Sequence, residues 1–222
     1  MALAALATGR VHVPGTAGGS GYRGRVTHPV GKERVNTVVL PHRGAAADFP
    51  DFSGQFSLRR LDLERDLDLV HAWMNDPEVA RFWKMPWPRE QIASYLRRQD
   101  RSTHSTPYLG ELDRVPMSYW ELYRADLDPL AQHYAALDHD AGVHLLLGLA
   151  ECRGQKLAVG LLRAVSTWQL DADPRATRVV GEPDVDNVRT IRVAELAGFR
   201  RITDIDLPNK RAALMVRNRE RR

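Results

Sequence analysis

Apolar and polar residues follow a strand-like or helix-like period over most of the chain after residue 55. Residues 56–59 alternate as a half-buried strand does, whereas the apolar residues of 61–73 recur at mostly helical spacing. Residues 143–149 are almost continuously apolar, which is typical of a strand buried on both faces. Proline ends the first helix at Pro77 and opens a second helix at Pro88.

The remaining segments also read as strands and helices. Gly198 follows a helical segment, and glycine most easily adopts the left-handed conformation that closes a helix. The order of a strand, two helices, three strands, a helix, a strand, a helix and two strands predicts a mixed α/β sheet. The further elements are strands at 106–112, 117–123, 177–181, 199–206 and 212–216 and helices at 157–168 and 187–197.

Residues 1–50 differ from the rest of the chain. They contain eight of the 16 glycines and no sustained apolar periodicity. We therefore expect a disordered or loosely docked N-terminal arm at 1–50 and a single globular domain at 51–222. The apolar start, residues 1–7, lacks a basic region and is short for a secretory signal, so we expect a cytoplasmic protein.

The composition of the 222 residues excludes several classes of protein. No apolar run approaches the roughly 18 residues that span a bilayer, and one cysteine, Cys152, cannot build a disulfide framework or a cysteine zinc site. The net charge of +4 comes from residues 1–50, which carry six basic and two acidic residues, while 51–222 carry 26 of each. A neutral body without a basic stripe argues against a nucleic-acid partner.

One polar residue interrupts the apolar strand at 143–149. His144 must have a hydrogen-bond partner at this position, because burial of an unpaired polar side chain costs free energy. It is either a core histidine that one backbone carbonyl satisfies or a proton acceptor, for which an ordinary pKa near 6.5 is suitable. A polar turn and a helix follow this strand, and such a junction can bind phosphate at the helix N-terminus or be a plain connection.

Two motifs at and beyond this junction resemble those of the GCN5-related N-acetyltransferase (GNAT) superfamily. Asn187, followed eleven residues later by Gly198-Phe199, resembles the superfamily's next helix. The resemblance implies a single GNAT-like domain, with a mixed, mostly antiparallel sheet flanked by helices, and acyl-CoA bound by the junction and by Asn187. The stretch that resembles the pyrophosphate loop is Arg153-Gly154-Gln155-Lys156-Leu157-Ala158.

A narrower similarity covers about residues 55–217. It is to the acyltransferases of hydroxamate siderophore pathways, such as the mycobactin lysine acyltransferase, the aerobactin acetyltransferase and the hydroxycadaverine acyltransferase of desferrioxamine synthesis. The segment 73–77 with Phe82-Trp83 resembles the start of that domain. The other segments that carry the similarity are 118–123, 142–144, 182–187 and 209–215.

The resemblance implies an acyl-CoA-dependent N-acyltransferase. The acceptor would be an amine or hydroxylamine of lysine, ornithine or cadaverine type, the donor acetyl-CoA or succinyl-CoA, and no metal would take part. It implies a catalytic pair of His144 and Glu182, in which the carboxylate orients the imidazole or acts as a second base. From its sequence alone Glu182 also fits a solvated carboxylate at a strand end. The alternatives are a general GNAT acetyltransferase for another small amine, such as an antibiotic, and a non-catalytic CoA-binding protein.

Two positions depart from the superfamily pattern. Lys156 stands where the first loop glycine is usual, so close approach of the backbone to pyrophosphate is not ensured, although lysine itself binds phosphate. Ala194 stands where many members have a tyrosine that protonates the leaving thiolate. Either another group supplies that proton or the thiolate leaves unprotonated.

Several side chains are candidates for contact with the acceptor. Tyr119, Glu121 and Tyr123 share one face of their strand, and Glu121 either holds a cationic amine or is a solvated carboxylate. Trp83 is a candidate for the wall of the acceptor cleft, and His71 is expected at the surface. We expect the basic C-terminal residues to be solvated, namely Arg217, Arg219, Arg221 and Arg222.

Overall fold

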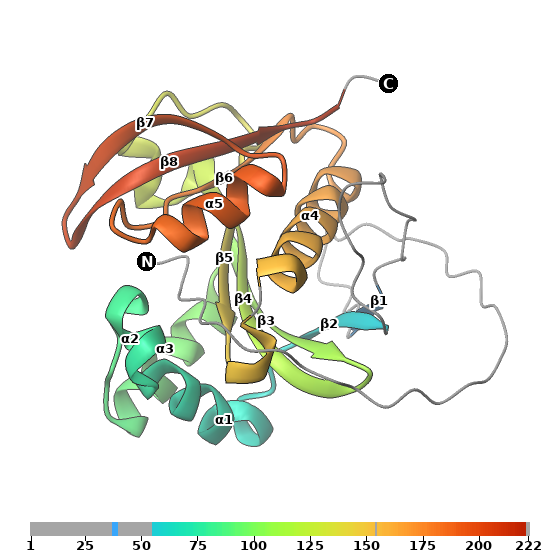
Figure 1. Cartoon of the computed structure of the whole chain (residues 1–222), viewed down its shortest axis with the longest axis vertical. Helices are drawn as coiled ribbons and strands as arrows, with labels where there is room; N and C mark the ends of the chain where they lie inside the picture. Colours follow the sequence, from blue (N-terminus) through green and yellow to red (C-terminus); the bar gives the residue numbers. More distant parts are fainter. Residues whose placement is uncertain (1–36, 40–54, 154, 221–222) are drawn as a thin grey trace, which may run out of the picture.

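The computed structural model describes residues 37–39, 55–153 and 155–220 (Figure 1). Eight strands of the described chain form one sheet in the order β1-β2-β3-β4-β5-β6-β8-β7. The strands are β1 Thr37–Val39, β2 Phe56–Arg60, β3 Ser105–Leu112, β4 Val115–Arg124, β5 Ala141–Leu147, β6 Arg178–Gly181, β7 Arg200–Leu207 and β8 Lys210–Asn218. The helices are α1 Leu63–Asn75, α2 Pro77–Trp83, α3 Arg89–Arg101, α4 Gln155–Ala172 and α5 Val188–Leu196, with short 3-10 turns η1 Ala125–Leu127, η2 Pro129–His133 and η3 Ala150–Cys152.

The sheet confirms the predicted mixed, mostly antiparallel architecture. All neighbouring strands pair antiparallel except β5 and β6, which are parallel. Their ladder joins Ala141 to Val179 and Gly142 to Val180 and then stops. The rest of β5 therefore runs on without β6 beside it, between the block of β6–β8 and α5 above and helices α1–α3 below in Figure 1.

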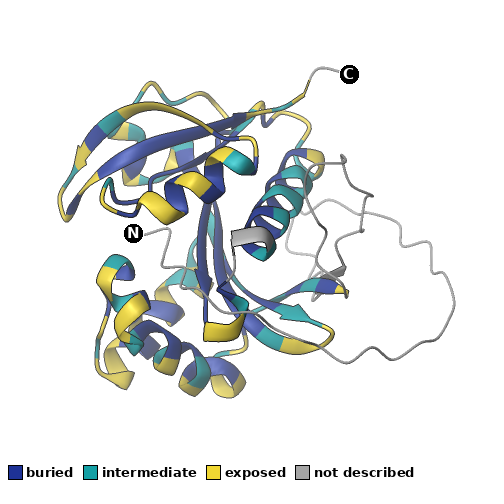
Figure 2. Cartoon of the chain, viewed as in Figure 1, coloured by how far each residue is buried: buried dark blue, intermediate teal, exposed yellow. Residues whose placement is uncertain are grey.

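Side chains on the two faces of the central strands β4 and β5 pack into two different hydrophobic cores. Trp120 and Val143 belong to a core with side chains of α4 and α5. Tyr119 and Leu146 belong to another core with α1, α2 and α3. The helices turn their exposed residues away from the sheet (Figure 2), so the central strands are buried on both faces, as the apolar run of β5 predicts.

One helix was not expected from the sequence. Pro77 does not only end a helix, because α2 begins at this residue. Asp76 closes α1 and caps α2, its side chain accepting a hydrogen bond from the backbone N–H of Glu78. Proline at a first helical position is favourable, and the same residue type therefore both stops one helix and starts the next.

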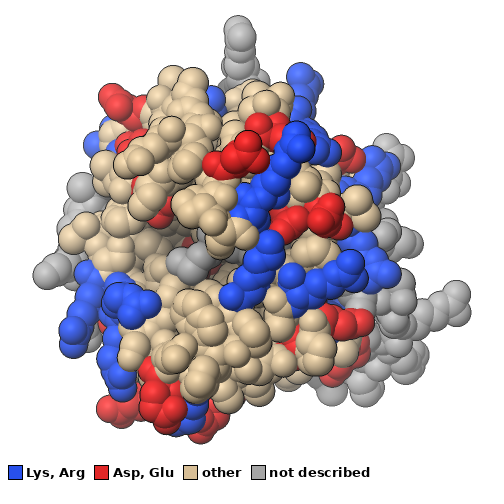
Figure 3. Space-filling model, turned by 90° about the vertical axis from the view of Figure 1, so that its left-hand side faces the viewer, with Lys and Arg blue, Asp and Glu red and all other residues tan. Residues whose placement is uncertain are grey.

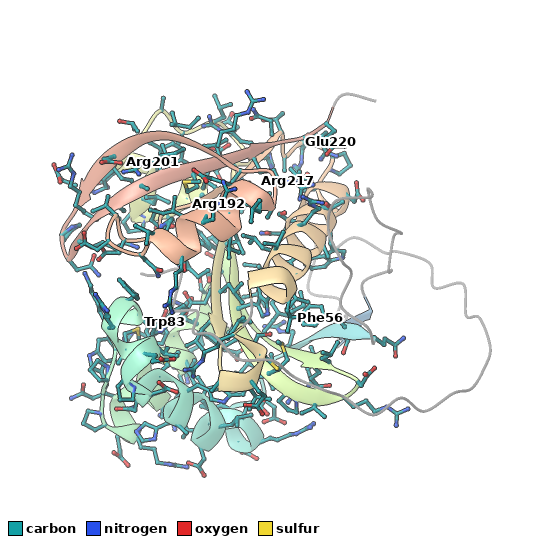
Figure 4. The ribbon with its side chains drawn as sticks, in the orientation of Figure 1. Phe56, Trp83, Arg192, Arg201, Arg217 and Glu220 are labelled. Carbon is teal, nitrogen blue, oxygen red and sulfur yellow. The ribbon has the colours of Figure 1, made fainter. Side chains whose placement is uncertain are left out.

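The two ends of the chain differ from expectation in places. Thr37–Val39, within the predicted arm, form β1 and pair antiparallel with β2, while the remaining residues of 1–50 lie outside the described residues. The prediction of a solvated C-terminal tuft is wrong for Arg217 and Arg219. Arg217 is buried and donates to the Arg163 carbonyl in the middle of α4 and to the Thr167 hydroxyl (Figure 4). Arg219 donates to the carbonyls of Asp173 and Ala176, just beyond the C-terminus of α4, so α4 and the turn after it supply acceptors for both cations.

The other half of that prediction, Arg221 and Arg222, lies outside the described residues. No helix in the described part of the chain has the length and apolar character needed to span a bilayer.

Candidate active site

Three neighbouring strands bring an imidazole and two carboxylates together. Glu121 of β4 is paired directly with His144 of β5 in the sheet register, and Glu182 follows the last residue of β6. Nδ1 of His144 lies 2.9 Å from Glu121 Oε2, and Nε2 lies 2.7 Å from Glu182 Oε1. The two predicted catalytic residues are thus in contact, and a second carboxylate that was not expected to join them holds the other ring nitrogen.

The carboxylate of Glu121 is saturated by protein groups. Its Oε1 accepts hydrogen bonds from the hydroxyls of Tyr95 and, at 2.9 Å, Tyr119, while Oε2 faces His144. The residue is only 1% exposed, so the interpretation as a solvated carboxylate is wrong. Contact with a substrate cation stays a prediction, and the hydrogen bonds favour a role of Glu121 through the imidazole.

Glu182 is equally buried and has two further neighbours. The hydroxyl of Tyr123 donates to Glu182 Oε2 at 3.2 Å and lies the same distance from His144 Nε2. Nζ of Lys210 donates to the Glu182 carbonyl oxygen and lies 3.5 Å from Oε1. The interpretation of Glu182 as a carboxylate in solvent is therefore wrong, because β8 lies beside β6 and directs Lys210 into the site.

The charges of this cluster stabilise one another. Burial alone would lower the pKa of His144, but the charge of Glu182 and hydrogen bonds to both carboxylates raise it above its ordinary value. Burial would raise the pKa of Glu182, but His144 and Lys210 hold it well below its ordinary value. Burial is likewise outweighed at Glu121, whose pKa is lowered by hydrogen bonding to His144. Charge interactions and hydrogen bonds therefore outweigh burial at all three groups of this network.

A cavity of about 370 Å³ reaches this network. Glu121, Tyr123, His144 and Glu182 form one part of its wall. Figure 3 shows the molecule from the side where α2 and the β7–β8 hairpin lie, with a hollow near the centre and basic side chains gathered along one side. The wall is completed from the end of α3, the start of β3, η2 and the β7–β8 turn, with Arg98, Gln99, His104, Asp128, His133 and Asn209 among its residues.

The predicted acyl-CoA residues lie on another side of β5. Asn187 is the N-cap of α5, its side chain accepting from the Thr190 N–H at 3.2 Å, and it lines a second cavity of about 340 Å³. α2 supplies the opposite wall of that cavity, with Arg81 and Phe82. Asn187 is therefore a structural cap of α5, and its contact with acyl-CoA stays a prediction.

The predicted pyrophosphate loop is described only in part. Gly154 lies outside the described residues, and of Gln155 and Lys156 only the backbone, as the first turn of α4, is described. Leu157 packs against the core, and Ala158 is fully buried in it. None of the described wall of the first cavity comes from this turn.

Arg153 has a structural role that the sequence did not predict. Its buried guanidinium donates to the carbonyls of Leu147 and Gly148, and to the carboxylates of Asp76 at 2.6 Å and Glu78 at 3.0 Å. The hydrogen bond from Arg153 holds the pKa of Asp76 below its ordinary value. Arg153 thereby ties the end of β5 to the start of α2, and its binding of acyl-CoA stays a prediction.

The aromatic candidates surround the imidazole. Trp83, labelled in Figure 4 at the end of α2, stands edge-on to Tyr119 at 5.8 Å and to His144 at 6.4 Å between ring centroids. Its indole N–H is buried without a hydrogen-bond partner among the described residues. His71 is half-buried on α1 rather than fully at the surface. Tyr95 and Lys210 are site residues that the sequence analysis did not single out.

Comparison with known proteins shows the family to which the chain belongs. The family model described as "Acetyltransferase (GNAT) domain" matches residues 62–207. The N(6)-hydroxylysine O-acetyltransferase of Escherichia coli is 37% identical over 77% of this chain and 54% of its own length. The lysine N-acyltransferase MbtK of Mycobacterium sp. (strain MCS) is 33% identical over 84% of this chain and 77% of its own. The chain thus spans about half the length of the first relative and most of the second.

Solved structures give the same result. An uncharacterized protein from Bacillus halodurans is 30% identical with a TM-score of 0.74, over 84% of this chain and 92% of that chain. The aminoglycoside acetyltransferase AAC(6')-Ib in complex with coenzyme A is 27% identical with a TM-score of 0.66, over 73% and 94%. The chain therefore belongs to the GNAT acetyltransferase domain family, in the hydroxamate siderophore acyltransferase branch that its motifs indicate.

Proposed function

We propose that this chain is an acyl-CoA-dependent N-acyltransferase that acts on an amine or hydroxylamine of lysine, ornithine or cadaverine type in hydroxamate siderophore biosynthesis. The observation that carries the proposal is His144, held between two buried carboxylates on the wall of a cavity of about 370 Å³. Relatives named for hydroxylysine and lysine support the acceptor class. The coenzyme A complex of AAC(6')-Ib supports acyl-CoA, either acetyl-CoA or succinyl-CoA, as donor.

The reaction needs a group that accepts a proton. The lone pair of the attacking nitrogen forms the C–N bond at the thioester carbonyl carbon, the C–S bond breaks, and the nitrogen loses one proton. Coenzyme A leaves as a thiolate, and a thiol comparable to cysteine, with a pKa of about 8.5, tolerates this. Because the thiolate can leave unprotonated, the reaction does not require a tyrosine at the position of Ala194, which is buried and offers no proton.

We assign the proton acceptor to the His144–Glu182 pair as a unit. A neutral imidazole lone pair would repel a carboxylate at 2.7 Å, so one proton lies between Nε2 and Glu182 Oε1. Glu182 Oε2 is then the oxygen that receives the proton of the attacking nitrogen. The hydroxyl of Tyr123 lies 3.2 Å from this oxygen and orients it. Glu121 holds the imidazole from the other side, as a positioning residue.

The weak basicity of this pair favours a hydroxylamine as acceptor. The charges of His144 and Lys210 hold the pKa of Glu182 low, so the carboxylate is a poor base for a lysine ammonium of pKa about 10.4. A hydroxylamine is a far weaker base than lysine and reaches the site already neutral. Its nitrogen becomes acidic only as the C–N bond forms, when a carboxylate suffices to take the proton.

Acyl-CoA would reach the site from the side of α4 and α5. The N-terminal turn of α4 and its preceding loop, with Arg153, Gly154, Gln155, Lys156, Leu157 and Ala158, would bind the pyrophosphate through backbone N–H groups and the helix dipole. Asn187, at the start of α5 and on the wall of the second cavity, would contact the pantetheine arm. Lys156 adds a cation where the superfamily usually has glycine.

Acyl transfer with a panel of acceptors tests the proposal. The full chain is incubated with acetyl-CoA or succinyl-CoA and N6-hydroxylysine, N5-hydroxyornithine, hydroxycadaverine, lysine or an aminoglycoside, and thiol release is followed together with the mass of the product. Hydroxamate formation with a hydroxylated acceptor is the expected result. Turnover confined to the aminoglycoside would support the antibiotic alternative instead. Acyl-CoA binding without turnover, unchanged in His144→Ala, would support a non-catalytic CoA-binding protein.

A further inference from the structure

One cation on the wall of the first cavity is not used by the network at His144. Among the charged side chains of that wall, Glu121, Glu182 and His144 contact one another, and Asp128 Oδ2 lies 3.8 Å from His104 Nε2. Arg98 differs from them. Within the described chain its guanidinium has neither an ion-pair partner nor a hydrogen bond.

Arg98 is exposed to solvent but is held near the site. It lies in the last turn of α3, three residues after Tyr95, and its guanidinium carbon is 5.9 Å from the centroid of the Tyr95 ring. A cation over an aromatic face is attracted by the ring, so this contact limits where the guanidinium moves. The hydroxyl of the same Tyr95 donates to Glu121. One tyrosine thus links the unpaired cation to the network that handles the proton.

We propose that Arg98 binds the carboxylate of the acceptor, so that the acceptor is an α-amino acid with a side-chain amine or hydroxylamine rather than a diamine. This inference rests on the proposed function, since it places the reacting nitrogen at Glu182 and the other end of the acceptor towards Arg98. A guanidinium offers two parallel N–H donors that match a carboxylate. A diamine would present a second ammonium to Arg98, and the like charges would repel.

Two acceptors that differ by one group test the inference. Hydroxycadaverine is N6-hydroxylysine without its α-carboxylate, so the ratio of their kcat/KM values isolates the contribution of that carboxylate. The ratio is measured for the wild-type chain, for Arg98→Ala and for Arg97→Ala, a neighbour that is exposed like Arg98 but does not line the cavity. We expect a preference of roughly 10- to 100-fold for hydroxylysine in the wild type and in Arg97→Ala, since a hydrogen-bonded charge pair contributes that much. The ratio should fall to near one in Arg98→Ala.

Calorimetric titration of both acceptors, without acyl-CoA, separates this inference from the proposed function. If the wild type and Arg97→Ala bind hydroxylysine more tightly than hydroxycadaverine and Arg98→Ala does not, Arg98 is the carboxylate site even if no hydroxamate forms. The inference is overturned if the wild type binds both acceptors equally, if it binds neither, or if the preference survives in Arg98→Ala. A missing hydroxamate product in the panel counts against the proposed function alone.

Discussion

Glu121→Gln removes a charge that the imidazole depends on while keeping the shape of the side chain. In the wild type, Glu121 Oε2 accepts from His144 Nδ1 at 2.9 Å, and its other oxygen accepts from Tyr95 and Tyr119. A hydrogen bond between charged groups contributes about 1.5 to 3 kcal/mol. If that contribution is made in the transition state, its loss lowers kcat by roughly 10- to 150-fold.

The same substitution changes the titration of the imidazole. Burial lowers the pKa of His144 and the two carboxylates together raise it, so with one carboxylate neutralised the pKa of His144 should fall. The assay combines steady-state kinetics with an NMR titration of the histidine ring and a measurement of the Kd for acyl-CoA. We expect a lower kcat, a lower pKa of His144 and an unchanged Kd for acyl-CoA.

A matched control is Glu111→Gln. Glu111 is also a strand carboxylate with a close charged partner, since Arg59 Nε donates to it at 2.6 Å, but it does not line the cavity. This variant should lower the melting temperature and leave kcat and the pKa of His144 as they are. Wild-type kcat in Glu121→Gln, with an unchanged pKa of His144, would refute the positioning role of Glu121.

Three further predictions concern the surroundings of the pair. Gly142→Ala should reduce kcat, because a Cβ at this position would lie 2.3 Å from ring atoms of Tyr123 and displace its hydroxyl; normal kcat with a folded protein would contradict this. Arg153→Leu should lower the free energy of unfolding by about 1 to 3 kcal/mol, since two carbonyls lose their donor, and a loss of acyl-CoA affinity without any loss of stability would contradict the structural role. Because folding raises the pKa of His144, this residue contributes stability that is complete below pH 6.5 and is lost as the pH rises through its folded-state pKa. Because folding lowers the pKa of Glu182, that residue contributes stability that is present above pH 4.5 and is lost as the pH falls through its folded-state pKa. Tm should therefore be highest between these limits, and Glu182→Gln should flatten the profile in differential scanning calorimetry.

The sheet was predictable because its strands carry strong periodic signals. The apolar run that His144 interrupts became β5, which is buried on both faces. The resemblance to the superfamily implied that His144 and Glu182 form a pair, and the pairing of β5 with β6 in the structure brings them together. The helix α2 was missed because proline is a signal for both the end and the start of a helix, and the Asp76 cap that decides between them is visible only in the folded chain.

The rest of the site depends on packing that periodicity does not encode. Tyr95 is one of several buried residues on α3, and nothing in the spacing of that helix indicates that its hydroxyl reaches Glu121 on β4. Lys210 begins β8 after a polar turn that predicts exposure, yet the order β6-β8-β7 turns it into the site. The prediction for Arg217 was wrong for a similar reason, because the middle of α4 packs against β8 there and supplies its hydrogen-bond partners.

The most direct test of the account is His144→Ala, assayed with a hydroxylated acceptor and with acyl-CoA binding measured alongside. Removing the imidazole takes away the group that holds Glu182 ready to receive the proton. We predict that turnover falls by at least ~10²-fold, the usual contribution of a general acid–base group, while the Kd for acyl-CoA changes little. Turnover close to that of the wild type would show that the chemistry takes place without this pair.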